Sequence, residues 1–136
     1  MPVAAKAGGG KNPLPACICC LMESFSRRIQ VNNLLRSVGM RTHGFSSAAE
    51  FLNSNEFYDT DCLLLDVRMP GMSGLDLQRQ LRASNSRIPI VFITSHADDD
   101  ARARALAAGA VAFLYKPCKK ETLLEAIDSA INRKVP

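Results

Sequence analysis

The sequence predicts an α/β domain built on one parallel sheet. From Ala16 onward, short apolar runs alternate with segments of helical period, a pattern typical of strands joined by helical crossovers. Three of the five apolar runs are hydrophobic enough for strands buried on both faces. The chain has 136 residues, which suffice for one compact domain and leave no room for a second of ordinary size.

Composition and charge exclude several classes of protein. The hydrophobic share is 47% and the charged share 22%, close to an average soluble domain. No apolar run reaches the roughly 18 residues that span a bilayer, so we expect no membrane-spanning segment. The net charge of +4 is spread along the chain, which argues against direct nucleic-acid binding.

The first fifteen residues form a segment of their own. Residues 1–15 hold three consecutive glycines and three prolines with little periodicity, so we expect a flexible tail, with the domain at residues 16–133. The segment lacks the continuous apolar block of a secretory signal, so a cytoplasmic protein is expected. The glycines do not form a phosphate loop, because Lys11 is followed by Asn12 and Pro13 rather than by Ser or Thr.

The first strand, Ala16–Met22, holds three of the five cysteines. Alternation sends Cys17 and Cys19 to one face and Cys20 to the other, whereas a metal site needs convergent ligands, such as a C-x-x-C pair with a second pair elsewhere. We therefore interpret them as small buried apolar side chains. The two isolated cysteines receive the same interpretation: Cys62 and Cys118.

The next segment predicts a helix with one buried face. Phe25 and Ile29 lie four residues apart, and the helical spacing continues through Val31, Leu34, Leu35 and Val38. Gly39 suits the C-terminal end of this helix. A second strand follows at Arg41–Phe45, and we expect His43 within it to be structural.

The middle of the chain predicts two helices around a third strand. The second helix begins at residues 47–50, where Ser47 and Glu50 have the spacing of a capping box. The third strand is Cys62–Asp66, and the third helix runs roughly from Gly74 to Ala83 with Leu77 and Leu81 on one face.

The last third predicts two more strand–helix units. A strand at Ile90–Thr94 precedes an alanine-rich helix, Asp98–Ala108, whose small side chains allow close approach to the sheet or to a partner. The fifth strand is Ala110–Tyr115. The last helix keeps its apolar period through Leu123, Leu124, Ile127, Ala130 and Ile131.

Polar side chains stand at the carboxyl ends of three strands, where ligands bind in open parallel sheets. Asp66 ends the third strand, Thr94 ends the fourth, and Lys116 follows the fifth. A carboxylate nucleophile can accept a phosphoryl group while a hydroxyl and an ammonium bind the oxygens on which charge accumulates. Taken singly, each has a structural alternative: a loop carboxylate, a β-branched strand residue and a solvated lysine. His96 is expected at the rim without a direct role.

Three segments in order resemble the receiver domain of bacterial response regulators, specifically the FixJ/NarL type. They are DCLLLDVRMPGMSGLDL at residues 61–77, IPIVFITSH at 88–96 and AAGAVAFLYKP at 107–117. The resemblance covers about Leu34 to Ile131. It implies a single three-layer (βα)5 domain of the flavodoxin-like, CheY-like fold, with a five-stranded parallel sheet in the order 2-1-3-4-5, two helices on one face and three on the other.

The resemblance also implies roles for individual residues. Asp66 would accept a phosphoryl group from a sensor histidine kinase, Thr94 would hydrogen-bond its oxygens, and Lys116 would pair with the carboxylate and then with the phosphoryl group. Phe113 corresponds to an aromatic switch residue that turns inward on activation, and the alternative is a plain core residue. The bond before Pro117 is expected to be cis. The fourth helix, fifth strand and fifth helix would form the output face and a homodimer interface.

The first strand departs from the family pattern. Receivers end it with two acidic residues that help to hold Mg²⁺, and an ungapped count places that pair on Met22 and Glu23. A thioether is no ligand for this cation. Mg²⁺ would retain Asp66, Glu23 and the backbone carbonyl of Arg68, so we expect weaker binding and slower transfer. Few residues before Leu34 resemble the family. Either a shifted reading frame or altered start upstream, or ordinary divergence, would explain this difference.

Two classes of function remain open. One is a phosphoacceptor signalling module that is not an enzyme, because any transfer is onto its own Asp66. The other is a degenerate receiver that binds partners or dimerises independently of phosphorylation, such as a fragment of a transcription regulator without its DNA-binding domain. A flavodoxin-like or nucleotide-binding enzyme is disfavoured, because residues 22–25 supply no Gly-rich or Ser/Thr-rich loop.

Overall fold

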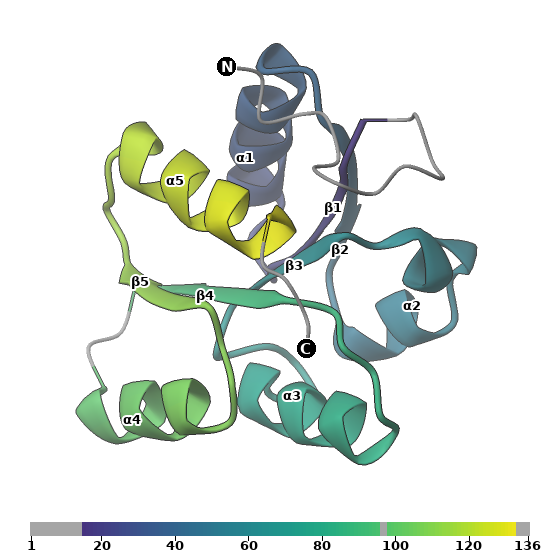
Figure 1. Cartoon of the computed structure of the whole chain (residues 1–136), viewed down its shortest axis with the longest axis vertical. Coiled ribbons are helices and arrows are strands. Elements are labelled where there is room, and N and C mark those ends of the chain that lie inside the picture. The colour runs from purple at the N-terminus through teal and green to yellow at the C-terminus, as the bar shows by residue number, and fades with distance from the viewer. Residues whose placement is uncertain (1–14, 96–97, 133–136) are drawn as a thin grey trace.

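The computed structural model describes residues 15–95 and 98–132, and within them five strands form one parallel sheet (Figure 1). The predicted tail, apart from Pro15, and His96 lie outside the described residues. The strand order is β2-β1-β3-β4-β5, as the resemblance implied. The strands are β1 (Cys17–Leu21), β2 (Arg41–Phe45), β3 (Cys62–Leu65), β4 (Ile90–Thr94) and β5 (Ala112–Tyr115).

Helices cover both faces of this sheet. They are α1 (Phe25–Ser37), α2 (Ala48–Leu52), α3 (Gly74–Ala83), α4 (Asp99–Ala107) and α5 (Lys120–Ile131). Figure 1 shows α1 and α5 on one side and α2, α3 and α4 on the other, which confirms the three-layer expectation. A short 3₁₀ helix, η1 (Asn55–Asp59), lies between α2 and β3 and was not predicted. No helix in the described part of the chain is long and apolar enough to span a bilayer.

The core consists of two clusters separated by the sheet. Cys17 and Cys19 lie in the cluster beneath α2, α3 and α4, whereas Cys20 lies in the cluster beneath α1 and α5. This confirms the predicted alternation along β1. All five residues of β1 are fully buried, because the strand lies in the middle of the sheet and both faces are covered. Cys62 is also fully buried, and the thiol of Cys118 is half-buried.

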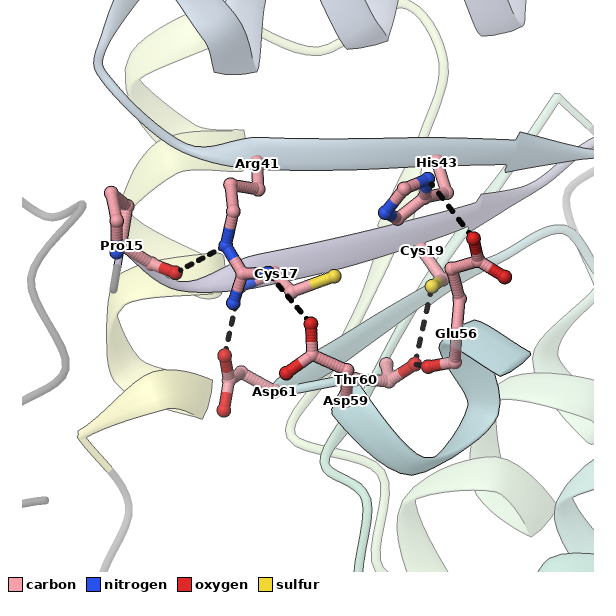
Figure 2. Close-up of polar contacts among 9 residues, drawn as sticks. All are labelled: Pro15, Cys17, Cys19, Arg41, His43, Glu56, Asp59, Thr60 and Asp61. Atoms are coloured by element: carbon pink, nitrogen blue, oxygen red, sulfur yellow. Dashed lines mark hydrogen bonds and ion pairs between the residues drawn. The ribbon is translucent and has the colours of Figure 1, made fainter. Parts of the chain in front are cut away.

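Polar contacts anchor the amino end of β1 to the segment before β3 (Figure 2). The Cys17 amide donates to a carboxylate oxygen of Asp61 at 2.8 Å, and the guanidinium of Arg41 pairs with Asp59 at 2.6 Å. His43 of β2 lies 3.8 Å from the carboxylate of Glu56 in η1. These contacts tie the first two strands to the turn that leads into β3, and therefore help to set the register of the sheet.

Side-chain caps define where four of the helices begin. The hydroxyls of Ser24, Ser47 and Ser73 and the carboxylate of Asp98 each accept a backbone N–H from the first turn of the helix that follows. Such caps contribute about 1 kcal/mol each. The capping-box expectation holds in part, because the Glu50 carboxylate accepts from the amide of Ser46 rather than from that of Ser47.

The expected burial of the whole apolar series on α1 was wrong. Phe25 is 68% exposed and Ile29 is 44% exposed, whereas Leu35 is fully buried. At 3.6 residues per turn, Ile29 lies about 120° around the helix axis from Leu35. A stripe centred on Leu35 therefore faces the sheet, and the Phe25–Ile29 pair faces away from it.

Candidate functional site

Asp66 immediately follows β3 at the carboxyl end of the sheet. Its backbone N–H donates to the carbonyl of Leu21 at 3.0 Å, so the residue is held beside the end of β1. The Arg68 amide donates to the carboxylate of Asp66 at 3.3 Å. The turn then closes with the Gly74 amide donating to the carbonyl of Val67 at 2.8 Å. These bonds present the Asp66 carboxylate at a defined point on the rim.

Lys116 meets Asp66 at this rim. The Nζ of Lys116 donates to Oδ2 of Asp66 at 3.4 Å, and the two side chains are 12% and 16% exposed. The Lys116 backbone N–H donates to the carbonyl of Thr94 at 2.7 Å, which joins the end of β4 to the end of β5. Thr94 is itself buried at the last position of β4. The structure thus brings an ammonium against a carboxylate, with a hydroxyl-bearing residue on the strand between them.

The electrostatic environment of Lys116 is that of a partly desolvated cation. Burial is the main influence and lowers the pKa of Lys116 below its ordinary value, the nearby Asp66 carboxylate raises it, and the positive charge of Arg27 lowers it. Charges removed from water interact more strongly with an ionic partner. The ammonium is therefore suited to bind an anion that arrives at Asp66.

Phe113 lies inside the domain rather than at its surface. Its ring packs against Phe92 of β4 with centroids 5.6 Å apart and against Tyr115 with centroids 5.5 Å apart. The peptide bond between Lys116 and Pro117 is cis, as the resemblance implied.

The end of β1 is a poor fit for a divalent cation. Met22 is fully buried in the apolar cluster beneath α1 and α5. Glu23 is exposed, and the guanidinium of Arg28 donates to the backbone carbonyls of both residues, at 3.1 Å for Glu23. Within the described ranges, no group of three or more His, Cys, Asp or Glu side chains is arranged to hold a metal ion. Met22 thus offers no oxygen ligand from its side chain, and the positive charge of Arg28 lies against the backbone carbonyls at this end of the strand.

Gly74 is a site-shaping residue that the sequence interpretation missed. A Cβ at this position would lie 2.2 Å from the carbonyl oxygen of Asp66 and 3.1 Å from Cε1 of Phe92. Only glycine allows the start of α3 to pack this closely against the backbone of Asp66. A glycine directly after the Ser73 cap was the one available signal, and it does not reveal the contact.

The chain is similar to proteins of one family. Residues 23–128 match the family model described as the response regulator receiver domain. Nodulation protein W of Bradyrhizobium diazoefficiens is 45% identical over 118 residues, which cover 87% of this chain and 52% of that protein. The response regulator protein TodT of Pseudomonas putida is 48% identical over 101 residues, which cover 74% of this chain and 44% of TodT. The chain thus spans about half the length of these curated relatives.

Solved structures show the same fold. The low-resolution structure of the response regulator StyR superposes with a TM-score of 0.79 at 43% identity, over 85% of this chain and 59% of that chain. The crystal structure of FixJ-N superposes with a TM-score of 0.79 at 31% identity, over 89% of this chain and 97% of that chain.

Proposed function

The chain belongs to the response regulator receiver domains of two-component systems, and we propose that it accepts a phosphoryl group on Asp66 from a phosphohistidine of a sensor kinase. Receiver domains of response regulators interact with sensor histidine kinases. The observation that carries the proposal is the ion pair of Asp66 and Lys116 at the carboxyl end of the sheet. The phosphoryl group stays on the chain itself, so the domain is an acceptor rather than an enzyme with a separate substrate.

The transfer is a displacement at phosphorus. A carboxylate oxygen of Asp66 forms the new bond while the bond from phosphorus to the donor imidazole nitrogen breaks, and the electron pair of that bond stays on the nitrogen. Negative charge spreads over the three remaining phosphoryl oxygens. The Lys116 ammonium, 3.4 Å from the carboxylate, would bind one of them, and the Thr94 hydroxyl another.

We assign the relay of the signal to the surface formed by α4, β5 and α5. β5 is an edge strand, and Phe113 within it packs against Phe92 and Tyr115. A change in the packing of Phe113 would therefore alter the surface where a second copy of the chain is expected to bind. Sedimentation measured with and without a phosphoryl donor tests this, and a monomer under both conditions contradicts it.

Mg²⁺ is expected to contribute less here than in receivers with two acids after the first strand. The ion would neutralise charge on the carboxylate and the incoming phosphoryl group, but Met22 offers no oxygen and the remaining donors are Asp66, Glu23 and the Arg68 carbonyl. We therefore expect slow labelling that responds weakly to Mg²⁺. The variant Met22→Asp, with its fold checked by circular dichroism, should respond more strongly.

Labelling with acetyl phosphate tests the acceptor directly. The full chain should gain a phosphoryl group that survives acid and is lost in base, and Asp66→Asn should abolish it. Asp76→Asn is the matched control, because Asp76 lies on α3 and its carboxylate pairs with Arg79, whereas Lys116 pairs with Asp66. Label that persists in Asp66→Asn would refute the assignment.

The second candidate, a degenerate receiver that acts independently of phosphorylation, is not favoured by the comparisons. The paired Asp66 and Lys116 also argue for retained chemistry. A folded chain that takes no label at any Mg²⁺ concentration and dimerises without a donor would reverse this preference.

A further inference from the structure

A cavity of about 430 Å³ lies between α1 and α5, beside Lys116. Its wall is formed by α1, the end of β4, the loop after β5 and the start of α5, and its characteristic residues are Arg27, Val31, Leu34, Lys116, Lys120 and Leu123. A cavity of this volume is within the range that encloses small organic ligands. We propose that it binds an amphipathic organic anion, namely a carboxylate carried on a hydrocarbon body.

The inner part of the cavity is apolar. Ile93 of β4 and Leu123 of α5 are almost fully buried and line its floor, and the half-buried side chains of Val31 and Leu34 line the wall contributed by α1. A hydrocarbon group placed here would be removed from water at a gain of roughly 25 cal/mol for each Å² of apolar surface that it buries. A small inorganic anion would leave this surface wet, so the lining favours a ligand with an apolar body.

The rim is cationic. Arg27 and Lys120 are exposed at the mouth, Lys116 reaches the cavity from the side of the phosphoacceptor, and none of the lining residues is acidic. Lys116 is paired with Asp66, but Arg27 adds a like charge close to it. An anionic head group between Arg27 and Lys120 would offset this repulsion. Charge therefore selects an anion over a neutral or cationic amphiphile.

The cavity is distinct from the exposed apolar patch on α1. Phe25 and Ile29 do not line it, so a helix that docks on those two side chains need not enter it. The buried floor suits a single chain or ring rather than a flat protein surface. The inference rests on the lining of the cavity and does not depend on phosphoryl transfer to Asp66.

A cysteine in the cavity wall, Cys118, can be used to detect ligand binding. Cys118 lines the cavity and is half-buried, whereas the other four cysteines are fully buried: Cys17, Cys19, Cys20 and Cys62. Alkylation of the folded chain by iodoacetamide should therefore begin at Cys118. Sodium decanoate should slow this alkylation in a saturable manner, at least fivefold at saturation, with a matching binding isotherm by titration calorimetry. Decyltrimethylammonium, which has the same chain and the opposite charge, should not protect.

Two lysine variants separate specific binding from general attraction. Lys120→Gln removes a rim charge and should weaken decanoate binding about 1.4- to fivefold, since exposed ion pairs contribute roughly 0.2–1 kcal/mol. Lys119→Gln removes the same charge from the adjacent exposed position, which does not line the cavity, and should leave binding unchanged. Equal weakening by both variants, protection by decyltrimethylammonium, or no protection by decanoate would each overturn the proposal.

Discussion

Replacing Gly74 with alanine should both destabilise the domain and displace the phosphoacceptor. The added Cβ would stand 2.2 Å from the carbonyl oxygen of Asp66, where 3.4 Å or more is an ordinary contact. The start of α3 and the backbone of Asp66 must therefore separate by about 1 Å, and overpacking of this kind costs about 1–3 kcal/mol. In a helix without this clash, replacing glycine with alanine would stabilise the helix by up to about 1 kcal/mol. A loss of stability in Gly74→Ala would therefore come from the contact with the Asp66 backbone.

Urea unfolding and acetyl phosphate labelling measure the two effects. A shift of about 1 Å at a reacting group can reduce its rate by roughly 10²-fold, so Gly74→Ala should label far more slowly even when it is fully folded. Gly44→Ala is the matched control, because the nearest atom to its added Cβ is Nδ2 of the Asn32 side chain, at 3.0 Å, rather than backbone. Gly74→Ala with the stability and labelling rate of the original chain would refute the reasoning.

Three further predictions concern Lys116, two buried cysteines and Phe51. Lys116→Met should reduce labelling of Asp66 by about 10²–10³-fold, because one donor to the developing charge is lost. Burial raises the pKa of Cys20 to about 12 and also raises that of Cys62. Both thiols therefore stay protonated in the folded chain, whereas in the unfolded chain they lose their protons above about pH 8.5. The free energy of unfolding in reducing buffer should therefore fall as pH rises above that value, by up to about 1.4 kcal/mol per thiol per pH unit. Phe51→Ala should cost about 3–5 kcal/mol in urea unfolding, because the ring is fully buried between those of Phe45 and Phe57.

Each of these predictions has a contradicting result. Lys116→Met that labels at the original rate would remove the ammonium from the mechanism. Cys62→Ala should make the alkaline loss of stability shallower, and an unchanged slope would show that burial of this thiol is not its cause. A loss below 1 kcal/mol for Phe51→Ala would mean that the ring cluster repacks around the gap.

The architecture was predictable because the spacing of apolar residues indicates each helix and strand, and this spacing is a local property of the sequence. The alternation along β1 placed Cys17, Cys19 and Cys20 correctly, since successive side chains of any strand point to opposite faces. The meeting of Asp66 with Lys116 was predictable for a related reason, because the carboxyl ends of neighbouring parallel strands share one edge of the sheet.

The features that the sequence did not predict depend on packing between segments that lie far apart in the chain. Phe25 and Ile29 satisfy a helical spacing, but which stripe of α1 faces the sheet is decided by the sheet. The contact of Gly74 with the Asp66 backbone depends on the approach angle of α3, and the bonds of Arg28 to the carbonyls at the end of β1 depend on where α1 begins. None of these has a signature in local composition.

β1 lies inside the sheet, but it lies outside the residues that match the family model. The family match begins at residue 23, whereas β1 ends at Leu21 and is hydrogen-bonded along both edges, to β2 and to β3. A recombinant fragment trimmed to the matched residues would lose the one strand that joins β2 to the remaining three. Such a fragment would expose two unsatisfied edges and aggregate, so expression boundaries for this domain must be drawn upstream of Pro15 rather than at residue 23, where the family-model match begins.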